Sequence, residues 1–164
     1  MKSFKFFHGQ ITKIDDFLID GSKEEEEGCY KLMSVVNRYG SIVNFLVTPD
    51  TYFVDHVMVA VGDKVTGFYD ANAAVPLILP PQFQAIVMAR DNQYKNVKVD
   101  YFDSELVSSD GNLKLIITPS TQVVLENYQP FTKTPENRNL IVVYGASTKS
   151  IPAQTVPYKV IVIC

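Results

Sequence analysis

The sequence predicts an all-β protein built from two small tandem barrels. Three observations lead to this fold class. Runs of four to eight β-branched and aromatic residues alternate with Gly, Pro, Asn and Asp, as in strands joined by turns. Helical periodicity is nearly absent. The chain also repeats itself at an offset of domain size, which indicates two copies of one unit. A single two-sheet β-sandwich is the alternative architecture.

The repeat is clearest around a Thr-Pro-x-Thr segment. Thr48-Pro49-Asp50-Thr51 returns as Thr118-Pro119-Ser120-Thr121, and each segment follows an apolar run. Two further pairs of segments repeat at a shift of about 75: Lys64–Tyr69 with Asn139–Tyr144, and Phe83–Met88 with Tyr158–Ile163. With 164 residues, 46% of them apolar, the chain can form two small cores. We expect units at 1–90 and 95–164, because residues 90–95 are polar and lack strand character.

In the first unit the pattern predicts strands at about 4–17, 30–36, 42–47, 52–54, 64–69 and 83–89. The Val61-Gly62-Asp63-Lys64 turn separates the fourth from the fifth, since Gly tolerates positive φ. Pro49 ends the third, because proline cannot donate to a ladder. Thr51 is expected to cap that bend through its hydroxyl.

The second unit is expected to repeat the series at about 97–107, 113–117, 122–126, 140–144 and 158–163. Ser109-Asp110-Gly111-Asn112 supplies its tight turn, and Pro119 and Thr121 repeat the bend of the first unit.

A long first strand, two more strands and a separated final pair suit a five-stranded barrel of the oligonucleotide/oligosaccharide-binding (OB) type. That fold usually carries a helix between its third and fourth strands. Residues 52–62 have strand and turn character instead. The absence of this helix keeps the sandwich open as an alternative.

Residues 9–89 resemble a little-studied family of small β-barrel proteins of Gram-positive bacteria. In some relatives a similar segment accompanies a domain related to the N-terminal part of copper amine oxidases. The resemblance implies an OB-like fold, and it supplies no activity that can be transferred to residues of this chain. The matching segments are Asn44–Asp55, Val61–Ala73, Pro76, Pro80-Pro81-Gln82 and Ala85-Ile86-Val87.

Charge and composition limit the classes of partner. The net charge is −3 and neither half is basic, so nucleic-acid binding is disfavoured. No apolar run approaches the ~20 residues of a membrane span, and the N-terminus lacks the pattern of a secretory signal. We therefore expect a cytoplasmic protein without membrane contact. Cys29 and Cys164 form neither a disulfide framework nor a metal motif.

The segment between the strands at 64–69 and 83–89 is mostly apolar, although a connecting loop should be polar. Three prolines stiffen it, and a stiff apolar loop loses little conformational entropy on binding. In the alternative interpretation, Leu77, Ile78 and Leu79 fold back to cover the core. The candidate binding residues are Tyr52, Tyr69, Asn72, Val75, Pro76, Leu77, Ile78, Leu79, Pro80 and Pro81. The second unit's equivalent, residues 145–157, is more polar.

An aromatic strand face is the alternative binding site, for single-stranded nucleic acid or carbohydrate. Alternation along a strand leaves about half of its aromatic side chains outside. The residues concerned are Tyr52, Phe53, Phe68, Tyr69 and Phe83.

Catalysis has weak support. A hydrolase would need the acidic side chains near His56 to converge, and their spacing does not require this. His8 and His56 have no second ligand close in sequence, so we expect no metal and no cofactor. Glu24–Glu27 is expected to be a solvated hairpin tip. The acidic candidates are Asp50, Asp55, Asp63 and Asp70.

From these observations we expect a non-enzymatic binding or assembly module. It would contact a protein partner, or a second copy of itself as a possible homodimer, through the proline-rich loop of the first unit.

Overall fold

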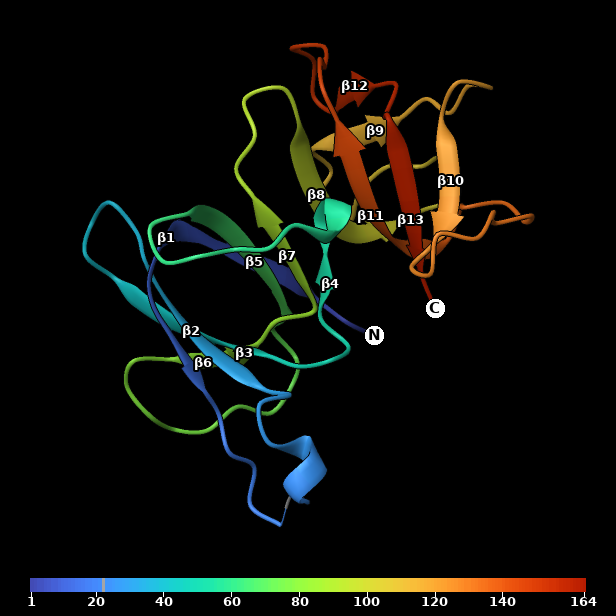
Figure 1. Ribbon diagram of the computed structural model, residues 1–164. Helices are drawn as coiled ribbons and strands as arrows, with labels where there is room; N and C mark the ends of the chain where they lie inside the picture. The colour runs from blue at the N-terminus through green and yellow to red at the C-terminus, as the bar shows by residue number, and fades with distance from the viewer. Residues whose placement is uncertain (22) are drawn as a thin grey trace. The chain divides into compact units, whose positions relative to one another are not determined.

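The computed structural model describes residues 1–21 and 23–164 and contains two compact units, Met1–Asp91 and Asn92–Cys164 (Figure 1). Strands dominate both. The helical segments among the described residues are two single 3₁₀ turns, η1 at Glu24–Glu26 and η2 at Val54–His56. The prediction of an all-β protein is confirmed. None of the helical segments described is long and apolar enough to cross a membrane.

The first unit consists of seven strands in the order β4-β7-β5-β1-β2-β3-β6. Turn η2 stands where an OB barrel usually carries a helix, and Asp55 within it is non-helical, with φ of 61°. The strands are β1 (Phe4–Asp16), β2 (Lys31–Val36), β3 (Ile42–Val47), β4 (Tyr52–Phe53), β5 (Lys64–Asp70), β6 (Gln82–Gln84) and β7 (Val87–Arg90).

Strand β1 is long enough to serve two neighbours. Its residues 4–10 pair with β5 and its residues 10–16 pair with β2, both antiparallel. The strand passes close to β2 at Gly9, where a Cβ would lie 2.4 Å from the carbonyl oxygen of Val36. Only glycine permits this approach. A register shift between Ile11 and Lys13 adds a bulge just beyond it.

Residues 82–90 link β3 to β5 by backbone hydrogen bonds to both strands. Strand β6 pairs parallel with β3, and β7 pairs antiparallel with β5. Between them, the N–H of Ala85 donates to the carbonyl of Leu46 at 2.9 Å, and that of Ile86 to the carbonyl of Phe68 at 2.8 Å. Backbone pairing therefore runs from β3 through residues 82–90, β5, β1 and β2 back to β3.

The core of this unit consists of the side chains that alternate to one face of these strands. Phe45 is fully buried, and the ring leaves no room for a side chain at Gly67, where a Cβ would lie 2.4 Å from Phe45 Cζ. The buried cluster comprises Ile11, Met33, Val35, Val43, Phe45, Val47, Val65, Ala85 and Met88.

The second unit has a four-stranded sheet in the order β10-β13-β11-β8 and a parallel pair, β12-β9. Its core cluster includes Phe102, Leu113, Leu140 and Val160. The strands are β8 (Asn96–Phe102), β9 (Leu113–Leu115), β10 (Gln122–Leu125), β11 (Arg138–Tyr144), β12 (Ala153–Thr155) and β13 (Lys159–Ile163).

The two units share a pairing scheme. β4 and β7 pair parallel, as do β10 and β13; β3 and β6 pair parallel, as do β9 and β12. β5 pairs antiparallel with β1 and β7, as β11 does with β8 and β13. In the first unit, six-residue ladders join β1 to β2 and β2 to β3. The second unit has only isolated bridges at the corresponding place, Phe102–Ser108 and Val107–Lys114.

The structure corrects several expected boundaries and one register. The predicted strand 83–89 is two strands that bend at Ala85 and Ile86, β8 ends at Phe102, and β12 was not expected. Val87 pairs with Tyr52, and Lys159 pairs with Gln122 in the same way. Lys159 follows Val87 by 72 positions, so the expected shift of about 75 for this strand is wrong by three.

Candidate interaction surface

The proline-rich loop, residues 71–81, joins β5 to β6. All residues from 71 to 80 are exposed, and Pro81 is half-buried. The exposed fraction is 101% for Leu77, 90% for Leu79 and 51% for Ile78. These three side chains therefore lie in solvent and do not fold back over the core. Val75 and Pro76 are exposed beside them.

Hydrogen bonds fix the start of the loop. The Asp70 carboxylate accepts from the N–H groups of Ser3 at 3.0 Å and Asn72 at 2.9 Å. These bonds, the Ser3 N–H first, lower the pKa of the Asp70 carboxyl group. The N–H of Ala71 donates to the Ser3 carbonyl at 2.7 Å, and the Asn72 side-chain amide donates to the carbonyl of Met1 at 3.0 Å.

The end of the loop is fixed by β3. The Asn44 N–H donates to the carbonyl of Pro81 at 2.9 Å, immediately before β6 begins. The Leu79–Pro80 peptide bond is cis. The apolar residues from Val75 to Leu79 therefore project between two anchored ends.

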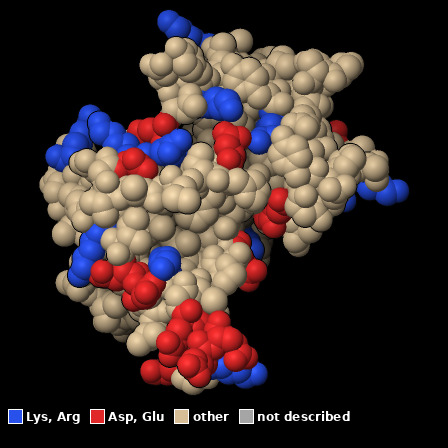
Figure 2. Space-filling view, in the orientation of Figure 1, with Lys and Arg blue, Asp and Glu red and all other residues tan. Residues whose placement is uncertain are grey.

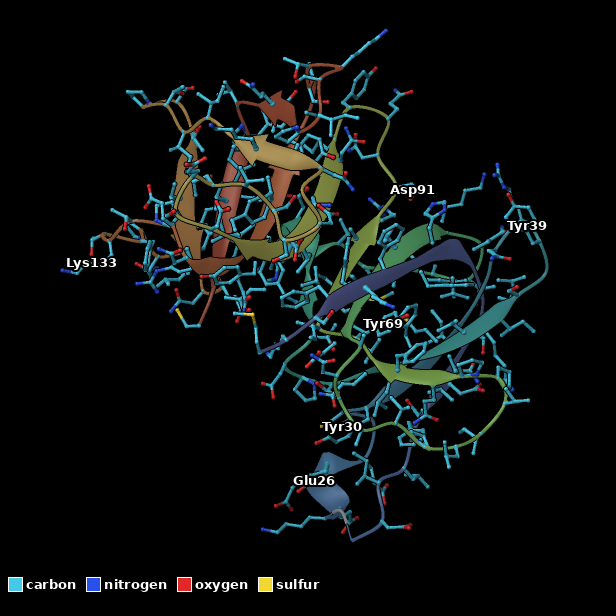
Figure 3. All side chains as sticks on the ribbon, turned by 180° about the vertical axis from the view of Figure 1, so that it is seen from behind. Glu26, Tyr30, Tyr39, Tyr69, Asp91 and Lys133 are labelled. Atoms are coloured by element: carbon cyan, nitrogen blue, oxygen red, sulfur yellow. The ribbon has the colours of Figure 1, made fainter. Side chains whose placement is uncertain are left out.

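Tyr69 forms the base of this surface. Its ring stacks on Phe83 with a centroid distance of 4.0 Å and an interplanar angle of 6°, and it lies 6.3 Å from the ring of Phe45. The stack joins β5 to β6 where the loop leaves and returns (Figure 3). Burial raises the pKa of the Tyr69 hydroxyl.

Tyr52 does not belong to this surface. It lies on β4, is 8% exposed, and packs edge-on to His56 with a centroid distance of 6.1 Å. A residue that binds a partner at the loop must have an exposed side chain. Because Tyr52 is buried, we remove it from the candidate binding residues.

The expected aromatic face offers little open ring surface. Phe68 is 4% exposed, and Phe53 and Phe83 pack partly against the core cluster. Together with the buried Tyr52 and the stacked Tyr69, this accounts for all five aromatic candidates. A stacking platform needs open ring faces, so the structure gives no support to this alternative.

Two of the acidic side chains proposed for hydrolysis lie far apart. Asp63 precedes β5 and Asp70 ends it, so at about 3.3 Å per residue they are roughly 23 Å apart. The Asp63 carboxylate accepts from the Ala60 N–H at 2.9 Å, and Asp50 is exposed in the turn after β3. Asp63 and Asp70 are therefore too far apart to act on the same bond.

Metal-ligating side chains also lie apart: residues 1–21 and 23–164 contain no group of three His, Cys, Asp or Glu suited to a metal ion. His8 Nε2 instead lies 2.8 Å from a carboxylate oxygen of Asp91. The acidic tip, Glu24–Glu27, has no buried side chain within η1 and forms the red cluster at the bottom of Figure 2.

The second unit presents a related loop, residues 145–157. Thr148 ties it to Gln154 in both directions: its N–H donates to the Gln154 carbonyl, and its hydroxyl accepts from the Gln154 N–H, both at 2.9 Å. Ile151 is 90% exposed and precedes a cis Pro152. Sequence reasoning missed Ile151 because it is an isolated large aliphatic residue in a segment of mostly polar and small residues.

Comparison with known proteins found no family model, no curated protein and no solved structure that matches the chain. The resemblance to the Gram-positive β-barrel family stays a prediction.

Proposed function

We propose that each unit is a barrel of the OB type and that the chain arose by tandem duplication of one such module. The proposal is supported in the first unit by the circuit of backbone pairing through β3, residues 82–90, β5, β1 and β2. The same parallel and antiparallel partners recur in the second unit. The reduced link between β8 and β9 makes the second copy the more diverged one.

The proposed function is that of a non-enzymatic binding module whose proline-rich loop contacts an apolar surface of another protein. One observation carries it: Leu77, Ile78 and Leu79 are exposed between anchored ends. Exposed contiguous aliphatic side chains are typical of interaction sites. Because the prolines and the anchors restrict the loop before binding, ordering it costs little entropy.

Two observations support a protein partner over a charged ligand. The segment from Ala71 to Pro81 contains no charged residue, so a phosphate or sulfate group would find no cation there. The aromatic rings that could stack on a base or a sugar are buried or already stacked, as described above. An apolar protein surface suits the loop.

The test uses a photoreactive benzophenone amino acid at position 77 of the full chain, in the cells that make the protein. We expect a discrete crosslinked species, identified by mass spectrometry, that disappears when Ile78→Asp and Leu79→Asp are added. The matched control carries the same group at position 58, because Met58 is 90% exposed, nearly as much as Leu77, but lies outside the loop.

Circular dichroism melting separates contact from folding. Since the substituted side chains are in solvent, the melting temperature should change by less than about 2 °C. A crosslinking pattern identical at positions 58 and 77, or collapse of the fold in the loop variants, contradicts the proposal.

A further inference from the structure

The apex of the proline-rich loop is not held by hydrogen bonds of its own. In the part of the chain that the structure describes, residues 74–80 neither donate nor accept one. The prolines stiffen this segment, because each fixes its own φ, but they do not determine where the segment points. The direction in which the exposed aliphatic side chains project is therefore decided at the two ends of the loop.

The related loop of the second unit is held differently. There Thr148 and Gln154 bond to each other within the loop, in both directions. Residues 71–81 of the first unit contain no bond of this kind, among those that the structure describes. The first loop therefore depends on residues outside it.

The first residues of the chain hold the start of the loop. The last pair of the β1–β5 ladder joins Phe4 to Asp70, so residues 1–3 continue alongside the beginning of the loop (Figure 1). We call residues 1–3 the N-terminal segment. Its carbonyl groups accept two bonds from the loop, one from the Ala71 N–H and one from the side-chain amide of Asn72.

The Asp70 carboxylate joins the same two segments through a single atom. Its Oδ1 accepts from the Ser3 N–H at 3.0 Å and from the Asn72 N–H at 2.9 Å. The Ser3 N–H is the main cause of the lowered pKa of this carboxyl group, and the charge of Lys2 acts in the same direction. The carboxylate is therefore ionised at neutral pH, and an ionised acceptor makes hydrogen bonds roughly twice as strong as a neutral one.

We infer that Asp70 is a positioning residue for the proposed contact surface. Its carboxylate fastens the N-terminal segment to the start of the loop and so sets the direction in which the aliphatic side chains project. Asn72, a candidate binding residue, serves this attachment through its side-chain amide. The attachment stands on these contacts alone, whereas its use in binding rests on the proposed function.

Loss of the attachment should free the apex without unfolding the unit. The side-chain bonds concerned lie at exposed positions, outside the buried cluster around Phe45, so they contribute little to the free energy of unfolding. A loop that is no longer fixed must be ordered when a partner binds, which weakens binding.

Backbone ¹⁵N relaxation of the full chain measures the attachment without any partner. The amides of residues 73–75 and 77–79 should have order parameters of about 0.85, and Asp70→Ala should lower them below about 0.6. The matched control is Asp63→Ala, because the Asp63 carboxylate also accepts a backbone N–H, at the other end of β5. Asp70→Asn keeps an uncharged Oδ1 acceptor and should give intermediate values.

Two substitutions at Ser3 isolate its bond to Asp70. Ser3→Pro removes the N–H that donates to the carboxylate, whereas Ser3→Ala keeps it. Ser3→Pro should therefore lower the order parameters of the loop, and Ser3→Ala should leave them unchanged. Adding Ser3→Pro to Asp70→Ala should lower them little further, because both changes remove the same bond. Melting curves confirm that each variant is folded.

Crosslinking from the benzophenone group at position 77 measures the effect on binding. Asp70→Ala should reduce the yield of the crosslinked species about three- to tenfold, and Asp63→Ala should not. Order parameters indifferent to Asp70→Ala and Ser3→Pro, or lowered equally by Asp63→Ala, overturn the inference. An unchanged yield from a loosened loop contradicts the positioning role. If the loop loosens as expected but position 77 gives no discrete species even in the unsubstituted chain, the attachment is confirmed and the proposed function fails.

Discussion

At the scale of single residues, two positions require glycine because neighbouring atoms leave no room for a Cβ, not because of a turn. Gly9 faces a backbone carbonyl of β2, whereas Gly67 faces the ring of a buried phenylalanine. Neither has a positive φ. Their role is to allow β1 to approach β2 closely and β5 to pack closely against the core.

Gly67→Ala should destabilise the first unit by about 1–3 kcal/mol, because the new Cβ would lie 2.4 Å from the Phe45 ring in a closely packed core. Denaturant unfolding followed by circular dichroism measures the loss. Adding Phe45→Leu should recover part of the lost stability, because the smaller side chain makes room for the new Cβ. The double variant should therefore be more stable than the sum of the two single effects predicts. Thr66→Ala, on the opposite face of β5, is the control. Additive effects of the Gly67 and Phe45 substitutions would contradict this account.

Asp110 is the most perturbed carboxyl group described in the second unit. Burial by itself would raise its pKa. The ammonium of Lys98 at 2.5 Å, the hydroxyl of Ser108 at 2.6 Å and the N–H of Asn112 at 3.0 Å outweigh burial and lower the pKa from 3.8 to about 2. The carboxylate thereby holds the turn at Gly111, whose φ is 74° as the sequence predicts.

The depressed pKa gives the second unit an acid dependence. The stabilisation by ionised Asp110 is present above the unfolded-state pKa near 3.8 and is lost as the pH falls towards 2. Because the side chain is 43% exposed, solvent screening reduces the effect to about 1 kcal/mol. Urea unfolding between pH 5 and pH 2 should show this slope, and Asp110→Asn should flatten it. An unchanged slope in the variant would refute the assignment.

At the scale of elements, the repeated Thr-Pro bends adopt one geometry. The hydroxyl oxygen of Thr51 accepts from the Thr48 N–H at 3.0 Å, and that of Thr121 accepts from the Thr118 N–H at 3.3 Å. Thr51 also donates to the Ala85 carbonyl at 2.8 Å, which ties its bend to the joint between β6 and β7.

Thr51→Val should therefore cost more than Thr121→Val. We expect about 1.5 kcal/mol at position 51, where two part-buried bonds are lost, and about 0.5 kcal/mol at position 121, where one long bond is lost. Each variant is the control for the other, since the replacement is identical and nearly isosteric. Unfolding monitored by NMR signals from each unit assigns the loss. Equal costs at the two positions would show that the Ala85 bond contributes nothing.

Sequence patterns located most strands because runs of Val, Ile and aromatic residues between turn residues carry that information. They failed where alternation is absent. The strand β13 is Lys-Val-Ile-Val-Ile, and four of its five residues are buried, so no polar face fixes its register. Strand β12, with three residues, is too short to give a pattern.

The candidate surface was located by its sequence for a similar reason. An apolar segment with three prolines contrasts with ordinary loops, and this contrast needs no tertiary information. Tyr52 was misplaced because the two-residue strand β4 does not reveal which face is covered. The division of β1 between two partners, β5 along its first half and β2 along its second, could not be predicted, since it depends on which strands become neighbours.

At the scale of the whole chain, the two units differ in charge and in length. Residues 1–91 carry 8 basic and 12 acidic residues, hence −4, and residues 92–164 carry 7 and 6, hence +1. Glu24–Glu27 accounts for the whole excess of the first unit. The units span 91 and 73 residues, and the β2–β3 hairpin of the first has only isolated bridges as its counterpart.

The stretch between Phe102 and Leu113 of the second unit has isolated bridges and turn hydrogen bonds in place of continuous ladders. Because turn bonds can open singly whereas a ladder opens as a unit, a protease acting on the native protein should cut this stretch more readily than the corresponding strands of the first unit. The six-residue ladders at the same place in the first unit would resist that cut. At this place the second unit is therefore the one that we expect proteolysis to open more readily.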